Sequence, residues 1–147
     1  MKLKHLTTAA MALILMSACT EGAGVGLEPD DLAGTWVASS MVFTSVADNT
    51  MSVDIVVAES AVVTLVLGAD GTYTFSFVSS VEVEEESGTY TVSGSILTIL
   101  SLLPEVLDPE SMTISRDGDN MTLTLADTFD FVDGVEEDAT LVITLAR

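Results

Sequence analysis

Hydrophobic and polar residues alternate along much of the chain from residue 32 onward, and turn-forming residues interrupt the alternation repeatedly. The clearest example runs from Val62 to Phe77, where two β-prone segments flank the sequence Gly68-Ala69-Asp70-Gly71. Alternation with a period of two places apolar side chains on one face of a strand, and Asp-Gly is a frequent turn between paired strands. This stretch therefore predicts a β-hairpin.

The same pattern predicts eight strands and no long helix. They cover residues 35–45, 51–67, 72–79, 82–92, 95–102, 112–116, 121–126 and 139–146, and we expect the second to be broken or bulged near residues 58–61. Strands joined by short loops pair antiparallel, and closing the meander removes its exposed edges. We therefore expect an all-β fold, an eight-stranded antiparallel up-and-down barrel over residues 32–147. Its short loops gather at one end, where the first strand begins and the last strand finishes.

The amino terminus carries a separate signal. Lys2, Lys4 and His5 precede an apolar run over residues 6–16, and Cys19, the only cysteine, follows small residues. A positive start, a short apolar segment and small residues before a cleavage site are typical of a secretory signal peptide.

The segment Leu15-Met16-Ser17-Ala18-Cys19 resembles the lipobox of bacterial lipoproteins. The resemblance implies a signal peptide over residues 1–18, lipid attachment at Cys19 and a flexible acidic, glycine-rich tether over residues 19–31. It also implies a membrane-anchored protein of the cell envelope, in the outer membrane facing the periplasm or the exterior. An ordinary signal peptide that ends near a cysteine is the alternative.

The composition and charge of the chain exclude several classes of function. The chain has a formal net charge of −19, and removal of residues 1–18 would leave two arginines against 23 acids, a charge of 2 − 23 = −21. Such a surface repels nucleic acid. Without histidine, lysine or a free thiol, the mature chain cannot build a serine or cysteine triad, a Schiff base or a histidine or thiolate zinc site. Only a pair of carboxylates, of the kind that glycosidases use, is left for catalysis, and among 23 acids such a pair has almost no specificity as a signal. We therefore predict a protein that is not an enzyme and has no cofactor.

Two oxygen-rich loops are candidate calcium sites, because calcium binds oxygen ligands. Residues 117–120 and 127–138 are acidic and contain glycine, but neither has the spacing of an EF-hand loop. We favour solvated acidic turns and predict no metal site.

A family resemblance rests on the segment Gly34-Thr35-Trp36, which resembles the Gly-x-Trp opening of the lipocalins. With Asp70-Gly71-Thr72-Tyr73 and Ser87-Gly88-Thr89-Tyr90, residues 32–147 resemble the lipocalin-like domain of bacterial lipoproteins. The resemblance implies that Trp36 closes the barrel floor and that Arg147 packs over it. The predicted topology also makes these two residues neighbours.

An eight-stranded barrel can be filled by side chains or can hold one small ligand, and composition does not decide between them. The side chains that we expect to line a ligand are Tyr73, Phe75, Phe77, Tyr90, Met112, Met121 and Leu123. Our leading hypothesis is a lipoprotein that binds a small apolar or amphipathic molecule. A filled barrel serving as a structural or protein-interaction module of the envelope is the alternative, and the oligomeric state stays open.

A row of glutamates bears on ligand choice. In an unbroken strand, Glu82, Glu84 and Glu86 share a face with Tyr90. We favour a bulge at Ser87-Gly88 that turns the glutamates outward. Otherwise they line the barrel near its open end, where they would select a cationic or strongly hydrogen-bonding ligand.

Overall fold

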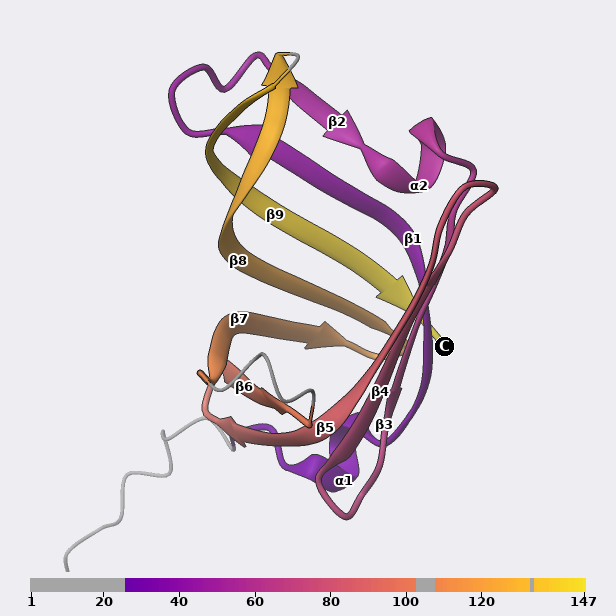
Figure 1. Ribbon diagram of the computed structural model, residues 1–147. Coiled ribbons are helices and arrows are strands. Elements are labelled where there is room, and N and C mark those ends of the chain that lie inside the picture. Colours follow the sequence, from indigo (N-terminus) through magenta and orange to yellow (C-terminus); the bar gives the residue numbers. More distant parts are fainter. Residues whose placement is uncertain (1–25, 103–107, 133) are drawn as a thin grey trace, which may run out of the picture.

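The computed structural model describes residues 26–102, 108–132 and 134–147, and most of these residues lie in strands (Figure 1). Cys19 and the predicted signal peptide lie outside the described residues. The strands are β1 (Gly34–Ser45), β2 (Ser52–Asp54), β3 (Val62–Leu67), β4 (Thr72–Val78), β5 (Val83–Ser93), β6 (Ile96–Ser101), β7 (Glu110–Asp117), β8 (Asn120–Val132) and β9 (Val135–Ala146). Two four-residue helices, α1 (Pro29–Leu32) and α2 (Ile55–Ala58), complete the described elements. In the described part of the chain, no helix has both the length and the apolar character needed to cross a membrane.

Eight of the strands close into a barrel. From β3 to β9 each strand pairs antiparallel with the next, and β1 closes the ring by pairing with both β3 and β9. Trp36 stands opposite Leu65 on one side of β1, and Phe43 stands opposite Leu141 on the other. This closed, antiparallel, lipocalin-like barrel confirms the predicted fold class.

The predicted strand over residues 51–67 is interrupted, as expected, but over a wider stretch than expected. Both β2 and β3 pair with β1, and α2 lies between them. The Asp54 carboxylate explains the break because it accepts hydrogen bonds from the backbone N–H groups of Val56 and Met41, both at 3.1 Å. An aspartate that satisfies an otherwise free N–H group favours the start of a helix. The chain returns to β3 through Ser60, which has a φ of +53°.

The loop predicted over residues 127–138 is wrong. There β8 and β9 continue as a hairpin, in which Phe129 stands opposite Glu137 and Asp130 opposite Glu136. Phe129 and Phe131 explain the difference, because Phe129 stacks on Phe43 at a ring distance of 4.6 Å and meets Phe131 edge-on at 4.9 Å. Their packing stabilises a strand in a segment whose acidic composition is more typical of a loop.

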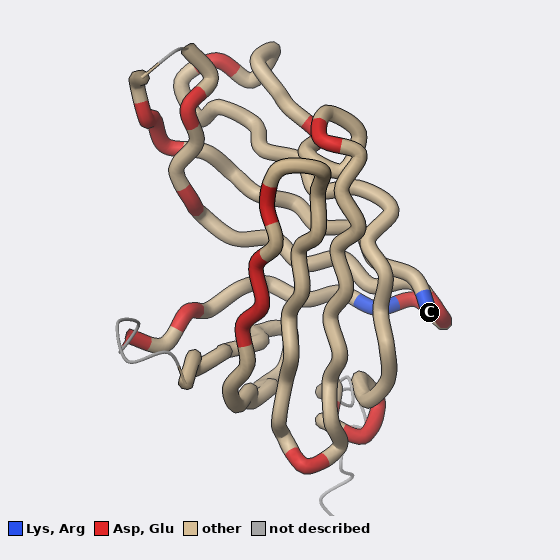
Figure 2. The backbone as a smooth tube through the Cα atoms, turned by 45° about the vertical axis from the view of Figure 1, so that its right-hand side comes forward, with Lys and Arg blue, Asp and Glu red and all other residues tan. Residues whose placement is uncertain are grey.

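The barrel interior is a continuous apolar core. Trp36, Leu32 and Val63 are fully buried, and inward residues of all eight barrel strands are buried or half-buried around them. The charged residues are unevenly distributed along the chain. Figure 2 shows acidic positions along most of the tube, whereas the basic positions gather beside the carboxyl terminus.

Candidate functional site

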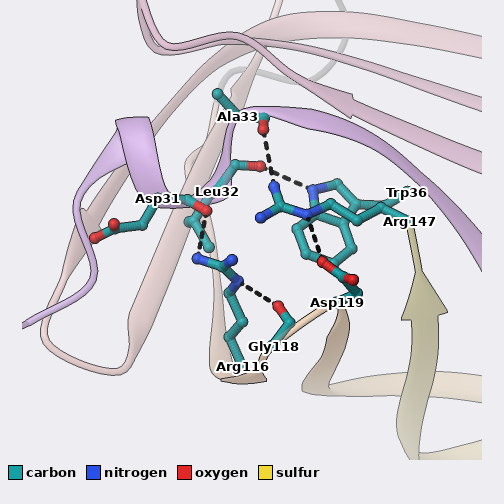
Figure 3. A network of polar contacts seen from close by, with 8 residues as sticks. All are labelled: Asp31, Leu32, Ala33, Trp36, Arg116, Gly118, Asp119 and Arg147. Carbon is teal, nitrogen blue, oxygen red and sulfur yellow. Dashed lines mark hydrogen bonds and ion pairs between the residues drawn. The ribbon is translucent and has the colours of Figure 1, made fainter.

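One end of the barrel is a sealed floor built around Trp36. The indole Nε1 donates a hydrogen bond of 2.8 Å to the carbonyl oxygen of Leu32, the last residue of α1. The Arg147 guanidinium lies over the indole ring, with its central carbon 4.7 Å from the ring centroid, and donates to the carbonyl oxygen of Ala33 at 3.1 Å (Figure 3). The structure therefore brings Trp36 and Arg147 together.

A second arginine, which the sequence analysis did not single out, contributes to the same floor. Arg116 lies 5.9 Å from the centroid of the Trp36 ring and donates to the carbonyl oxygens of Asp31 at 2.6 Å and Gly118 at 2.9 Å (Figure 3). Each contact between a cation and an aromatic face stabilises by about 0.5–2 kcal/mol. Residues 29–31, which we assigned to the tether, thus belong to a helix held against the barrel.

Tyr90 also belongs to the floor. Its buried hydroxyl lies 2.8 Å from the carbonyl oxygen of Gly68 and 3.2 Å from that of Pro29. Burial raises the pKa of Tyr90, and the charges of Asp70 and Asp30 add to the effect. The hydroxyl therefore stays protonated and joins the β3–β4 turn to α1.

Above the floor lies a cavity of about 160 Å³ inside the barrel. Four of the predicted lining residues reach it, namely Tyr73, Phe75, Met112 and Leu123. The other three, Phe77, Tyr90 and Met121, are buried but lie outside its lining. The remaining apolar lining residues are Met41, Val63, Leu65, Leu67, Leu97, Ile99, Leu125, Leu141, Ile143 and Leu145.

Glu86 enters this cavity because β5 has no bulge. Its register with β4 is continuous, with Phe75 opposite Glu86 and Tyr73 opposite Gly88, so the favoured interpretation of an outward-turned glutamate is wrong for Glu86. A Cβ atom at position 88 would lie 2.7 Å from the Tyr73 ring and 2.1 Å from the Leu100 carbonyl oxygen. Glycine is needed there to make room for the ring and the neighbouring strand. The Tyr73 hydroxyl then donates a short hydrogen bond to Glu86.

Two further carboxyl groups line the same cavity, those of Glu110 at the start of β7 and Asp127 on β8. Both residues are exposed, so the cavity meets solvent where they lie. Partial burial raises the pKa of the Glu110 carboxyl, and the charges of Asp127 and Glu86 raise it further. Burial also raises the pKa of Tyr73, and its hydrogen bond to Glu86 adds to this.

No basic side chain in the described part of the chain balances these three carboxyl groups. Arg116 and Arg147 are the only basic residues between positions 26 and 147, and both are at the floor. Among the described residues, the one ion pair joins Arg147 to Asp119 at 3.4 Å. The described side chains also contain no group of three or more histidine, cysteine or acidic residues suited to a metal ion. The cavity therefore combines an apolar interior with an uncompensated acidic mouth.

Sequence reasoning missed Glu110 and Asp127 because both were assigned to loops. The signal was present in the period-two pattern, since Glu110 continues the inward positions Met112 and Ile114, and Asp127 continues those of Leu123 and Leu125. Extending each strand by one repeat would have placed both acids on the inward face.

Comparisons of the chain with protein-family models, with curated proteins and with solved structures found no match.

Proposed function

We propose that this protein is a membrane-anchored, lipocalin-like lipoprotein that binds a small amphipathic molecule in its barrel and does not catalyse a reaction. The observation that carries the proposal is the cavity of about 160 Å³, which has an apolar lining and one polar side. Ligand sites are typically apolar hollows with a few polar groups that fix orientation. The sealed floor supports this role because it leaves the acidic side as the entrance.

The cavity volume limits the ligand. An apolar cavity of about 150 Å³ is known to hold benzene, whereas sites for drug-sized ligands occupy about 300–1,000 Å³. A ring or branched chain of about six heavy atoms fits the apolar part of this barrel, and a long acyl chain does not.

A cavity-filling variant tests binding. Leu123→Phe places a larger side chain in the cavity, whereas Leu100→Phe adds the same volume at a position that is 41% exposed. We expect benzyl alcohol to shift the amide signals of Tyr73 and its neighbours in NMR titrations of the native protein and of L100F, but not of L123F. Mass spectrometry of gently purified protein would identify a natural ligand directly. If benzyl alcohol gave no site-specific shifts in native protein, the barrel would not be a binder of small molecules.

The anchor is a separate part of the proposal. It rests on the lipobox-like segment ending at Cys19 and on the absence of any other cysteine. Two or more acyl chains hold a protein stably at a membrane, because each buried CH₂ group contributes about 0.8 kcal/mol. We expect labelled palmitate to be incorporated into the full-length protein and not into Cys19→Ser, and the variant to leave the membrane fraction.

An interaction module is the second candidate, and one observation favours it. Val62, Val78 and Val83 stand side by side on adjacent strands, and their side chains are 57%, 41% and 68% exposed. An exposed apolar row of this kind is typical of surfaces that contact other macromolecules. A protein that bound no small molecule but lost a stable membrane complex on Val78→Thr would support this role.

A further inference from the structure

The three carboxyl groups at the mouth come from different parts of the barrel wall. Glu86 lies on β5, Glu110 begins β7 and Asp127 lies on β8, so together they line one side of a cavity whose other walls are apolar. Glu86 is half-buried, and the Tyr73 hydroxyl is oriented toward it by their hydrogen bond. The polar side of the cavity is thus built from fixed strand positions.

The mouth is negatively charged, and no basic side chain of the described residues lies beside it. Like charges brought close together repel, and a cation that enters among them lowers the free-energy cost of that repulsion. Burial raises the pKa of the Glu110 carboxyl most, and the charges of Asp127 and Glu86 raise it further, which indicates that negative charges are crowded at the mouth. An anionic ligand would add a further negative charge to the mouth.

We propose that the cavity selects small organic cations, with an ammonium group among Glu86, Glu110 and Asp127 and a compact apolar body of about six heavy atoms inside the barrel. This inference rests on the proposed function, because it names the chemical class of ligand for the same cavity. Primary amines on a ring or a branched chain fit both the charge and the volume. Fatty acids are excluded by their charge and by their length.

The test compares three probes of the same ring size. Benzylamine is positively charged at neutral pH, benzyl alcohol is neutral and benzoate is negative. In calorimetric or NMR titrations at low salt, we expect benzylamine to bind at least tenfold more tightly than benzyl alcohol, and benzoate not to bind measurably. Raising sodium chloride should weaken benzylamine binding and leave benzyl alcohol binding unchanged, because only the former depends on charge.

Variants locate the charge effect. Glu86→Gln retains an acceptor oxygen for Tyr73 but removes the charge, and Glu110→Gln and Asp127→Asn change exposed positions. We expect the triple variant to bind benzylamine and benzyl alcohol within threefold of each other. Glu85→Gln is the matched control, since this neighbouring glutamate is exposed and does not line the cavity. It should retain the full preference for the amine.

The outcomes separate this inference from the proposed function. If benzyl alcohol binds but benzylamine binds no more tightly, the cavity is a binding site and the cation preference is wrong. If neither probe binds the folded native protein, the proposed function fails together with the inference. A preference for benzylamine that persists in the triple variant would also overturn the inference, because the selectivity would then come from elsewhere on the acidic surface.

Discussion

Gly88 is the position at which one methyl group should disturb both the barrel and its cavity. A Cβ atom there would lie 2.1 Å from the backbone oxygen of Leu100, more than 1 Å short of an ordinary contact, and 2.7 Å from the Tyr73 ring. A ring can rotate away, but the Leu100 oxygen belongs to β6, which pairs with β5 from Gly88 to Ser93. Relief therefore requires the two strands to separate. We expect Gly88→Ala to lower the free energy of unfolding by about 3 kcal/mol, the upper part of the range for overpacked interiors.

Urea denaturation followed by far-UV circular dichroism measures this loss, and in a thermal scan it corresponds to a fall of about 10 °C for a domain of this size. Ser87→Ala is the neighbouring control, because Ser87 is exposed and its change should stay within about 0.5 kcal/mol. The cost of Gly88→Ala should persist in a Tyr73→Ala background, since the backbone obstacle remains. A G88A protein within 1 kcal/mol of the native protein would refute the reasoning. A cost that vanished in the Y73A background would assign the obstacle to the ring.

Four further predictions follow from the floor and the cavity. Arg147→Ala should cost about 1–2 kcal/mol in urea denaturation, and more than Arg116→Ala, because Arg147 lies closer to the indole; an equal or smaller loss would contradict this ranking. Tyr73→Phe should cost about 1 kcal/mol because it removes the donor to Glu86, and an unchanged stability would mean that the hydrogen bond adds nothing. The raised pKa of Glu110 means that the folded protein binds this proton more tightly than the unfolded chain does. Its contribution to stability is full below the ordinary pKa of 4.5 and is lost as pH rises through the folded pKa. Glu110→Gln should therefore melt higher than the native protein above that range, with the difference shrinking toward acid pH, and a constant difference would contradict the assignment. Millimolar calcium should leave the melting temperature unchanged, because the acidic segment around Asp130 is a paired hairpin, and a rise beyond that given by sodium chloride of equal ionic strength would show a calcium site.

The barrel could be predicted from sequence because its signals are local. Alternation along residues 72–77 and 121–125 sets which side chains face inward, and short turns set the antiparallel order. Together these fix a closed meander without knowledge of any single long-range contact.

The errors arose where a distant residue decides a local conformation. The segment around Asp130 resembles a loop because acidic residues are depleted in strands. However, Phe129 on β8 stacks on Phe43 of β1, and the strand pairing continues. Gly88 resembles a bulge because glycine often marks one, but glycine is needed there because the Leu100 carbonyl oxygen and the Tyr73 ring of the two neighbouring strands lie too close for a side chain. In both cases the deciding contact comes from another strand, outside the window that a local pattern can cover.

The two arginines of the described residues both lie at one end of the barrel. Arg116 and Arg147 lie at the floor beside α1, and Glu86, Glu110 and Asp127 line the cavity above it. Figure 2 shows the basic positions together beside the carboxyl terminus. The two arginines therefore offset part of the negative charge at the floor, where Asp31 and Asp119 also lie, whereas no basic side chain of the described residues does so around the cavity. A protein tethered through the segment before α1 would keep this floor toward the lipid and the cavity opening toward the aqueous phase. Positively charged solutes would then be drawn to the opening from bulk water, over a range that shrinks to about 10 Å at 0.1 M salt.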